Sequence, residues 1–278
     1  MFKFKQFAEK YKVYIAVGLL ILAVSIISLA GQKSSESVEL PVAADNDNRA
    51  VIVINYHKID NIFHSLAVST GDFEKQMQWL KSHGYNSITP DQLYDFVADG
   101  AELPNHPVLI TFDDGYADNY KNAYPIMKKY GFVGTVFVVT SYLEKYPNYM
   151  TWAQAKEMHD NGFSIESHTV THKSMTEASD SQIMDELTKS RETIKEKLGE
   201  DADFFAYPTG TYNLHIARLA REAGYKAAFT IKYDTVNRNS NVYALERVPI
   251  FHTENTNKDF LERLQYIPII NKDGWVKK

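Results

Sequence analysis

The sequence contains no cysteine. Disulfide bonds, thiolate metal sites and a cysteine nucleophile are therefore excluded. An excess of positive charge is also missing, because 30 lysines and arginines stand against 35 aspartates and glutamates and the formal net charge is −5. Nucleic-acid binding needs a basic surface, so no nucleic-acid partner is expected. With 44% hydrophobic residues, the 278-residue chain can still form one large folded domain or two small ones.

Long hydrophobic runs are absent except at residues 13–30. At 1.5 Å per helical residue this run would span roughly 27 Å, close to the thickness of a bilayer core. Residues 1–12 carry four lysines and one glutamate, and basic residues on this side place the N-terminus in the cytoplasm. We therefore predict a single-pass membrane anchor with the rest of the chain outside the cell. The alternative is a signal peptide cleaved near Ala30, which would give a secreted protein.

The remainder of the chain divides by composition. Residues 31–49 are polar and lack periodicity, which indicates a flexible linker. Residues 50–270 are predicted to form the folded domain, and residues 271–278 a C-terminal tail.

Strand-like apolar runs alternate with helical patterns from residue 50 onward. The predicted strands are residues 51–55, 108–112, 134–139, 163–166, 204–206 and 226–230. The predicted helices are residues 72–83, 91–98, 117–130, 151–161, 179–198 and 214–223. This alternation is typical of an α/β fold with parallel strands covered by helices. About seven β/α units fit, which favours a barrel with its chemistry at the C-terminal ends of the strands.

Two adjacent aspartates follow the strand predicted at residues 108–112. Asp113 and Asp114 precede Gly115, which permits the sharp turn needed for both carboxylates to face the mouth of a barrel. Like charges this close raise the pKa of one carboxyl group unless a cation lies between them. A metal ion on one aspartate would leave the other free as a base. Taken alone, an Asp-Asp-Gly sequence is more often a simple turn.

Two histidines follow the strand predicted at residues 163–166. His168 and His172 are separated by Thr-Val-Thr, which disfavours a helix and favours a turn. Neutral imidazoles suit zinc, and Asp114 would complete a three-ligand site with an open position for water. The pattern therefore predicts one divalent metal, with zinc as the expected ion and cobalt or nickel as alternatives.

Two further strand ends carry candidates. A lone histidine is more often structural than catalytic. His57, however, follows residues 51–55 at the same strand end as the aspartates, so a catalytic role is as well supported as a structural one. The turn Pro208-Thr209-Gly210 follows residues 204–206 and could aim backbone N–H groups at an oxyanion. A plain β-turn before the next helix explains the same residues equally well.

Taken together, three motifs resemble those of the polysaccharide deacetylase family. They are T-F-D-D-G at residues 111–115, S-H-T-V-T-H at residues 167–172 and F-A-Y-P-T-G-T-Y at residues 205–212, and the resemblance extends over roughly residues 50–252. It implies a distorted (β/α)7 barrel. It also implies that Asp113 is the general base and that Asp114, His168 and His172 hold the metal.

The chain departs from the family pattern in three places. Ala206 stands where many members carry an arginine that steadies the catalytic aspartate, and Arg247 is a candidate replacement. The fourth motif's Asp-Trp and the late Leu-x-x-His that bears the general acid are not evident, although His252 follows a strand-like segment. Conversely, V-I-N-Y-H at residues 53–57 resembles the branch that deacetylates poly-β-1,6-N-acetylglucosamine in biofilms, in which an N-terminal strand supplies the acid. The resemblance thus assigns His57 as the acid.

The expected reaction is hydrolysis of N-acetyl groups on an extracellular N-acetylglucosamine polymer. The metal would activate water and the acetyl carbonyl, Asp113 would take the proton, the Thr209 N–H would stabilise the oxyanion and His57 would protonate the amine. The alternatives are a peptidoglycan or chitin-oligosaccharide deacetylase and an inactive polysaccharide-binding protein. A glycosidase is disfavoured, because its two carboxyl groups must lie about 5–9.5 Å apart across a sugar and adjacent aspartates would not span one.

Overall fold

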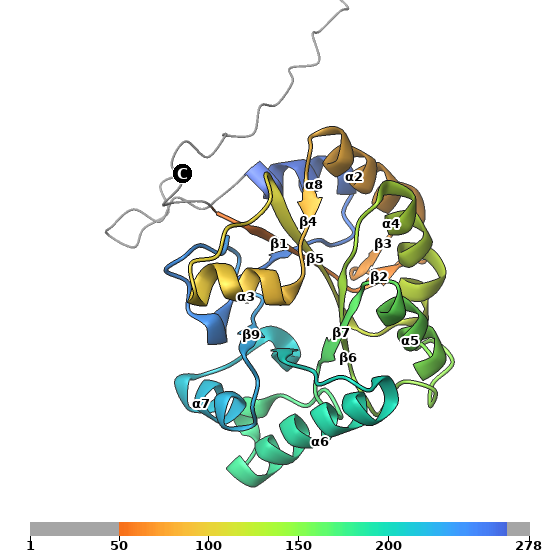
Figure 1. Ribbon diagram of the computed structural model, residues 1–278. Helices are drawn as coiled ribbons and strands as arrows, with labels where there is room; N and C mark the ends of the chain where they lie inside the picture. Colours follow the sequence, from red (N-terminus) through yellow and green to blue (C-terminus); the bar gives the residue numbers. More distant parts are fainter. Residues whose placement is uncertain (1–49, 266–278) are drawn as a thin grey trace, which may run out of the picture. The chain divides into compact units, whose positions relative to one another are not determined.

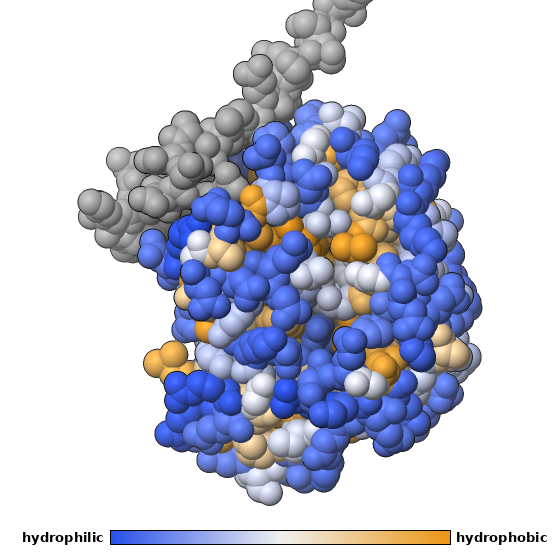
Figure 2. All heavy atoms as spheres, viewed as in Figure 1, coloured by the Kyte–Doolittle hydropathy of each residue, from blue (hydrophilic) through white to orange (hydrophobic). Residues whose placement is uncertain are grey.

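The computed structural model describes residues 50–265 of the chain. Within these residues an eight-stranded parallel sheet has the order β10-β1-β5-β6-β7-β8-β9, and β4 pairs with β5. A separate two-stranded sheet consists of β2 and β3. Figure 1 shows the helices arranged around the strands. Figure 2 shows a largely hydrophilic surface on the face in view, interrupted by separate apolar patches.

The elements have the following bounds. The strands are β1 (Ile52–Tyr56), β2 (Lys58–Ile59), β3 (Ala67–Val68), β4 (Asn86–Ser87), β5 (Pro107–Asp114), β6 (Thr135–Val138), β7 (Ser164–Ser167), β8 (Phe204–Ala206), β9 (Ala227–Phe229) and β10 (Val248–Pro249). The α-helices are α2 (Thr70–Ser82), α3 (Pro90–Ala98), α4 (Tyr124–Tyr130), α5 (Trp152–Asp160), α6 (Asp180–Leu198), α7 (Leu214–Glu222) and α8 (Thr256–Gln265). Short 3-10 turns are η3 (Met175–Glu177), η4 (Pro208–Gly210) and η5 (Val242–Ala244), and η2 (Asn119–Ala123) is a π-helical turn.

Local sequence explains where the helices begin and end. Helices α3, α5 and α6 each begin at a capping box, in which a Thr or Ser hydroxyl accepts from the third backbone N–H and a Gln side chain accepts in return. Helix α6 ends at Gly199, whose φ of 89° few other residues adopt. Phe73, Met77 and Leu80 line the buried face of α2, as their spacing predicts.

Strands β1, β5 and β6 are buried on both faces, which explains their apolar sequences. In β8, Phe204 packs into the core enclosed by the sheet, together with Leu109, Phe137 and Phe229. Its neighbour Phe205 points to the other face and packs under α6 and α7. Side chains of successive strand residues thus serve two separate cores.

The sheet curls strongly. Leu245 forms a parallel bridge with Phe229 at the end of β9, where Thr230 N donates to Leu245 O at 2.9 Å. Three residues later the chain enters β10, in which Val248 pairs with Ile54 of β1. One segment therefore contacts both β9 and β1. The predicted α/β class is confirmed, with a curled parallel sheet.

The segment predicted as one helix over residues 117–130 is divided in two. The turn η2 occupies Asn119–Ala123 and α4 follows it. Pro125 has no backbone N–H and cannot continue the regular α-helical ladder across this junction. The π turn positions Asn119, whose Nδ2 donates to the backbone oxygen of His57 at 2.7 Å. The π turn therefore places Asn119 where it can bind the backbone of His57, a candidate catalytic residue.

Between residues 50 and 265, no helix is long and apolar enough to cross a membrane. The predicted anchor at residues 13–30 lies outside the described residues, as do the basic segment before it and the linker at residues 31–49. Residues 266–278 lie outside them as well.

Candidate active site

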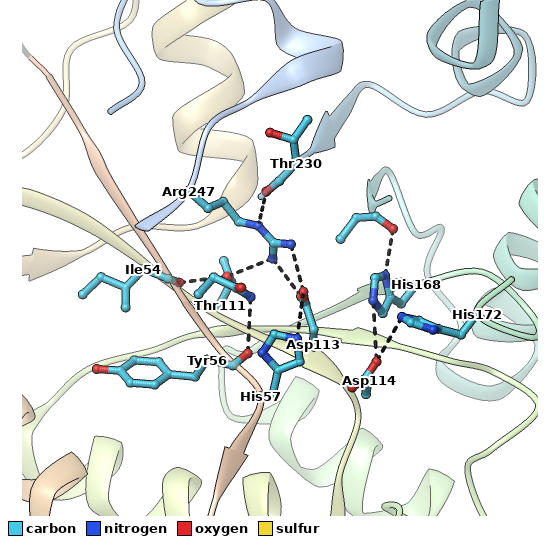
Figure 3. Close-up of polar contacts among 12 residues, drawn as sticks. Ile54, Tyr56, His57, Thr111, Asp113, Asp114, His168, His172, Thr230 and Arg247 are labelled. Carbon is cyan, nitrogen blue, oxygen red and sulfur yellow. Dashed lines mark hydrogen bonds and ion pairs between the residues drawn. The ribbon is translucent and has the colours of Figure 1, made fainter. Parts of the chain in front are cut away.

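The candidate residues gather at the C-terminal ends of neighbouring strands (Figure 3). His57 follows β1, Asp113 and Asp114 end β5, and His168 follows β7 directly. Parallel pairing aligns these strand ends, because β5 pairs with both β1 and β6, and β6 pairs with β7. The candidates therefore share one edge of the sheet, as the barrel rule applied to the sequence predicts.

Asp113 and Asp114 both face the site because the chain turns at Asp114 itself. Asp114 has a φ of 75° and Gly115 a φ of 81°, so the turn begins one residue earlier than the glycine that the sequence singles out. A Cβ atom at Gly115 would lie only 3.1 Å from Val138 and 3.2 Å from Leu143. The glycine is therefore needed for close packing as well as for its backbone angle.

Asp114, His168 and His172 form a compact donor group. Asp114 Oδ1 lies 3.6 Å from His168 Nε2 and 3.4 Å from His172 Nε2, and all three ligand atoms lie within 4.8 Å of one another. Ligands at about 2.0–2.1 Å from a tetrahedral zinc ion are roughly 3.4 Å apart, so this spacing fits a metal. No other such group of three occurs within residues 50–265.

The tautomer of His168 is set by the backbone of β8. Its Nδ1 lies 2.8 Å from the carbonyl oxygen of Ala206, so Nδ1 carries the proton and donates it in a hydrogen bond. Nε2, on the side of Asp114, is then unprotonated and has its lone pair free to bind a metal. Burial lowers the pKa of His168 despite the neighbouring carboxylates. The ring is therefore neutral, which is the form that binds a metal.

The turn that carries the two histidines is strained and is held from α6. Thr169 and His172 have φ values of 68° and 59°. The carboxylate of Glu186 accepts hydrogen bonds from Val170 N at 2.8 Å, Thr171 N at 2.8 Å and Thr171 Oγ1 at 2.6 Å. Three bonds to one charged acceptor offset the strain of this turn. Nothing in the local sequence points to Glu186, which lies on a different element.

Arg247 binds Asp113, which is the role expected of the missing third-motif arginine. Its Nη1 donates to Asp113 Oδ1 at 2.7 Å and its Nη2 to Asp113 Oδ2 at 2.8 Å. Its Nε donates to the carbonyl oxygen of Thr230 at 2.7 Å, and its side chain is fully buried. Burial alone would raise the pKa of Asp113, but the charge and hydrogen bonds of Arg247 outweigh it and hold that pKa well below its ordinary value. The structure therefore confirms the prediction, made from charge and position, that Arg247 binds Asp113.

His57 is the histidine that lies beside Asp113. Its Nε2 is 4.0 Å from Asp113 Oδ2, and its Nδ1 is buried without a protein partner. His252 is exposed, and its ring packs edge-on against Phe63 at 5.6 Å between centroids. The structure thus brings His57, and not the competing His252, to the aspartate.

Thr209 lies in the turn η4 after β8. It has a φ of 59°, which is unusual for a β-branched residue, and its hydroxyl is 2.9 Å from that of Thr211. Among the residues that the structure describes, six non-glycine residues have positive φ, and three of them, Asp114, Thr169 and His172, are candidate metal ligands or lie in the turn that carries one. Such clustering of strained backbone is typical of functional sites.

Known proteins resemble the chain in sequence and in fold. The family model for polysaccharide deacetylases matches residues 100–228. YxkH of Bacillus subtilis (strain 168), whose name assigns it to the same family, is 34% identical over 198 residues that cover 71% of this chain and 70% of YxkH. The poly-β-1,6-N-acetyl-D-glucosamine N-deacetylase of Staphylococcus aureus (strain MSSA476) is 28% identical over 271 residues, covering 87% of this chain and 93% of that protein.

A solved structure gives the same assignment. The Streptococcus pyogenes deacetylase PplD, solved in complex with acetate, superposes with a TM-score of 0.74 and 27% identity, over 79% of this chain and 100% of that one. The motifs, the arrangement of the strand ends and these relatives agree. The chain belongs to the polysaccharide deacetylase family and is a hydrolase that acts on carbon–nitrogen bonds other than peptide bonds.

Proposed function

We propose that the protein removes N-acetyl groups from poly-β-1,6-N-acetylglucosamine and releases acetate. The observation that carries the proposal is the position of His57 at the end of β1, 4.0 Å from an Asp113 that Arg247 holds in place. The S. aureus relative bears the name of this activity and is matched over 93% of its length. The same assignment implies a distorted (β/α)7 barrel, and the hydrogen bonds of Leu245 with the end of β9 support that fold.

We assign the metal site to Asp114, His168 and His172, with zinc as the expected ion. One carboxylate and two neutral imidazoles are a common zinc donor set, and the described residues offer no cysteine. When bound, a divalent cation polarises the acetyl carbonyl and makes a neighbouring water more acidic.

Two different side chains then carry out the two proton transfers. Asp113 stays ionised because Arg247 binds both of its oxygens, and each oxygen keeps a lone pair to accept the proton of the attacking water. The backbone N–H of Thr209 donates to the acetyl oxygen as negative charge develops there. His57 Nε2 gives a proton to the departing amine, which becomes the free glucosamine nitrogen.

We further propose that the protein acts outside the cell, held to the membrane through residues 13–30. The apolar run and the lysines before it support this orientation. Protease added to intact cells should digest the catalytic domain. Digestion only after lysis would overturn the proposed location.

The reaction is tested by acetate release from three substrates, with and without a chelator. They are β-1,6-linked N-acetylglucosamine oligomers, chitin oligomers and peptidoglycan. We expect the first to be preferred, the chelator to stop turnover, and Asp113→Asn to be inactive with its metal retained. Preference for chitin or peptidoglycan would overturn the substrate assignment. Release that survives the chelator would overturn the metal site, and binding without any release would indicate an inactive polysaccharide-binding protein.

A further inference from the structure

Four tyrosines form a cluster beside the candidate active site. Tyr142, Tyr146 and Tyr149 come from the loop between β6 and α5, and Tyr116 follows Gly115. Tyr116 stacks on Tyr149 with 4.9 Å between ring centroids, Tyr142 meets Tyr149 edge-on at 5.0 Å, and Tyr146 meets Tyr142 at 5.4 Å. We call these four residues the tyrosine cluster.

The loop that carries the cluster is bonded to both metal-site loops. On one side, Met150 N donates to Gly115 O at 3.0 Å and Ala117 N to Asn148 O at 2.9 Å. On the other side, Ser141 N donates to Val170 O at 3.1 Å and the hydroxyl of Tyr142 to Thr171 O at 3.2 Å. The cluster is therefore held at a fixed position next to the residues that flank Asp114 and His172.

The inner and outer members of the cluster differ in their surroundings. Lys58 Nζ lies 3.6 Å from the centroid of the Tyr116 ring and 3.7 Å from an oxygen of Asp118, so Tyr116 has a partner besides Tyr149. Tyr146 remains 41% exposed, and it is one of only five large hydrophobic residues that are exposed between residues 50 and 265. Tyr146 packs against Tyr142 and Tyr149, and Lys145 Nζ lies 5.4 Å from its ring centroid, yet much of the ring still faces solvent.

Tyrosine suits a neutral sugar better than a charged ligand. Its ring offers a flat apolar face to the C–H face of a pyranose, and its hydroxyl bonds to the polar rim.

We propose that the tyrosine cluster is a sugar-binding subsite, in which Tyr146 stacks on the N-acetylhexosamine ring next to the unit that is deacetylated. This inference rests on the proposed function and adds the residue that binds the neighbouring sugar unit of the polymer. An enzyme with such a subsite is faster on oligomers long enough to occupy it.

The test compares Tyr146→Ala and Tyr146→Phe with the native protein on β-1,6-linked oligomers of one to five units. We expect kcat/KM of the native protein to rise with oligomer length. Tyr146→Ala should lose about tenfold on the pentamer, equivalent to about 1.4 kcal/mol, and much less on the monomer. Tyr146→Phe keeps the ring and should retain most of the rise. Equal losses at every length, or no loss, would overturn the subsite.

Tyr120→Ala is the matched control, because Tyr120 also belongs to a stacked pair, with Tyr124, but on η2 and α4. It should keep the native dependence on length. The affinity of each full-length protein for β-1,6-linked and chitin pentamers, measured by calorimetry with chelator present, separates the two proposals. Weaker binding by Tyr146→Ala supports the subsite even if no acetate is released, a result that would overturn only the proposed function. If Tyr146→Ala and the native protein bind the β-1,6-linked pentamer with equal affinity, the subsite is overturned.

Discussion

Arg247 and Asp113 form a bidentate ion pair that is buried from solvent, although 134 positions separate them in the sequence. Breaking such a pair leaves a charge buried without a partner, which typically destabilises a protein by roughly 3–5 kcal/mol. We therefore expect Arg247→Met to lower the free energy of unfolding by about this amount and to remove most turnover. Urea unfolding of the native protein and of Arg247→Met, Asp113→Asn and the double variant measures the coupling. Additive losses would contradict it.

The same pair predicts the sign of a pH effect on stability. Because the folded-state pKa of Asp113 is lowered, its contribution is present above the unfolded-state pKa of about 3.9 and is lost as pH falls through the lower folded-state value. The difference in unfolding free energy between native protein and Arg247→Met should therefore be larger at neutral pH than in acid. A difference that grows in acid would contradict the assignment.

His57 and His252 give a direct comparison of two candidate acids. We expect His57→Ala to reduce kcat by roughly 10²–10⁴-fold, because an amine leaves poorly unless it is protonated. Metal content should stay unchanged, and His252→Ala should keep a near-native rate. A crippled His252→Ala with an active His57→Ala would reverse the assignment, and loss of metal from His57→Ala would make His57 a ligand.

The three-residue donor group predicts one divalent ion per chain. Asp114→Asn, His168→Ala and His172→Ala should each lose most of the bound metal, because each removes one of the three proposed protein ligands. Elemental analysis after gel filtration checks this, with Asp113→Asn as the control that keeps its metal. Full metal content in any of the three ligand variants would show that the donor set is wrong.

Glu186 is expected to act through the histidine turn that it holds. In Glu186→Gln the acceptor loses its charge, so the bonds from Val170 N and Thr171 N weaken, and the amide NH2 can no longer accept from Thr171 Oγ1. Loss of such supporting contacts typically weakens metal affinity about 10–100-fold. Competition with a fluorescent chelator measures this affinity. Glu192→Gln, an exposed position on the same helix, is the control and should bind as the native protein does.

The domain boundary at residue 50 makes a further prediction. A chain that begins at Asn48 should be soluble and active, because every described strand and helix of the site starts beyond it. Acetate release per bound metal, compared with that of the full chain, is the measurement. An insoluble or inactive product would place essential residues before Asn48.

The sequence alone determined what depends on neighbouring residues. The helices predicted at residues 151–161 and 179–198 agree with α5 and α6, and apolar spacing predicts the buried face of α2, because these effects act within one or two turns. The aspartate pair and the two histidines are likewise short motifs at strand ends, so the residues of the metal site can be recognised in the sequence. Strands of two residues, such as β2 and β3, carry too little pattern to be found in this way.

Only the tertiary structure decided how distant residues complete the site. Arg247 reaches Asp113 because β10 pairs with β1 and β1 pairs with β5, so the curl of the sheet brings the segment before β10 to the end of β5. Glu186 supports the histidine turn from α6, and Asn119 supports His57 through a π turn that helical periodicity does not reveal. These contacts depend on strand register and on packing between elements. A linear pattern carries no information about either, which is why the reaction class could be predicted from motifs, whereas Arg247 was only a candidate by charge and position and Glu186 and Asn119 were not predicted.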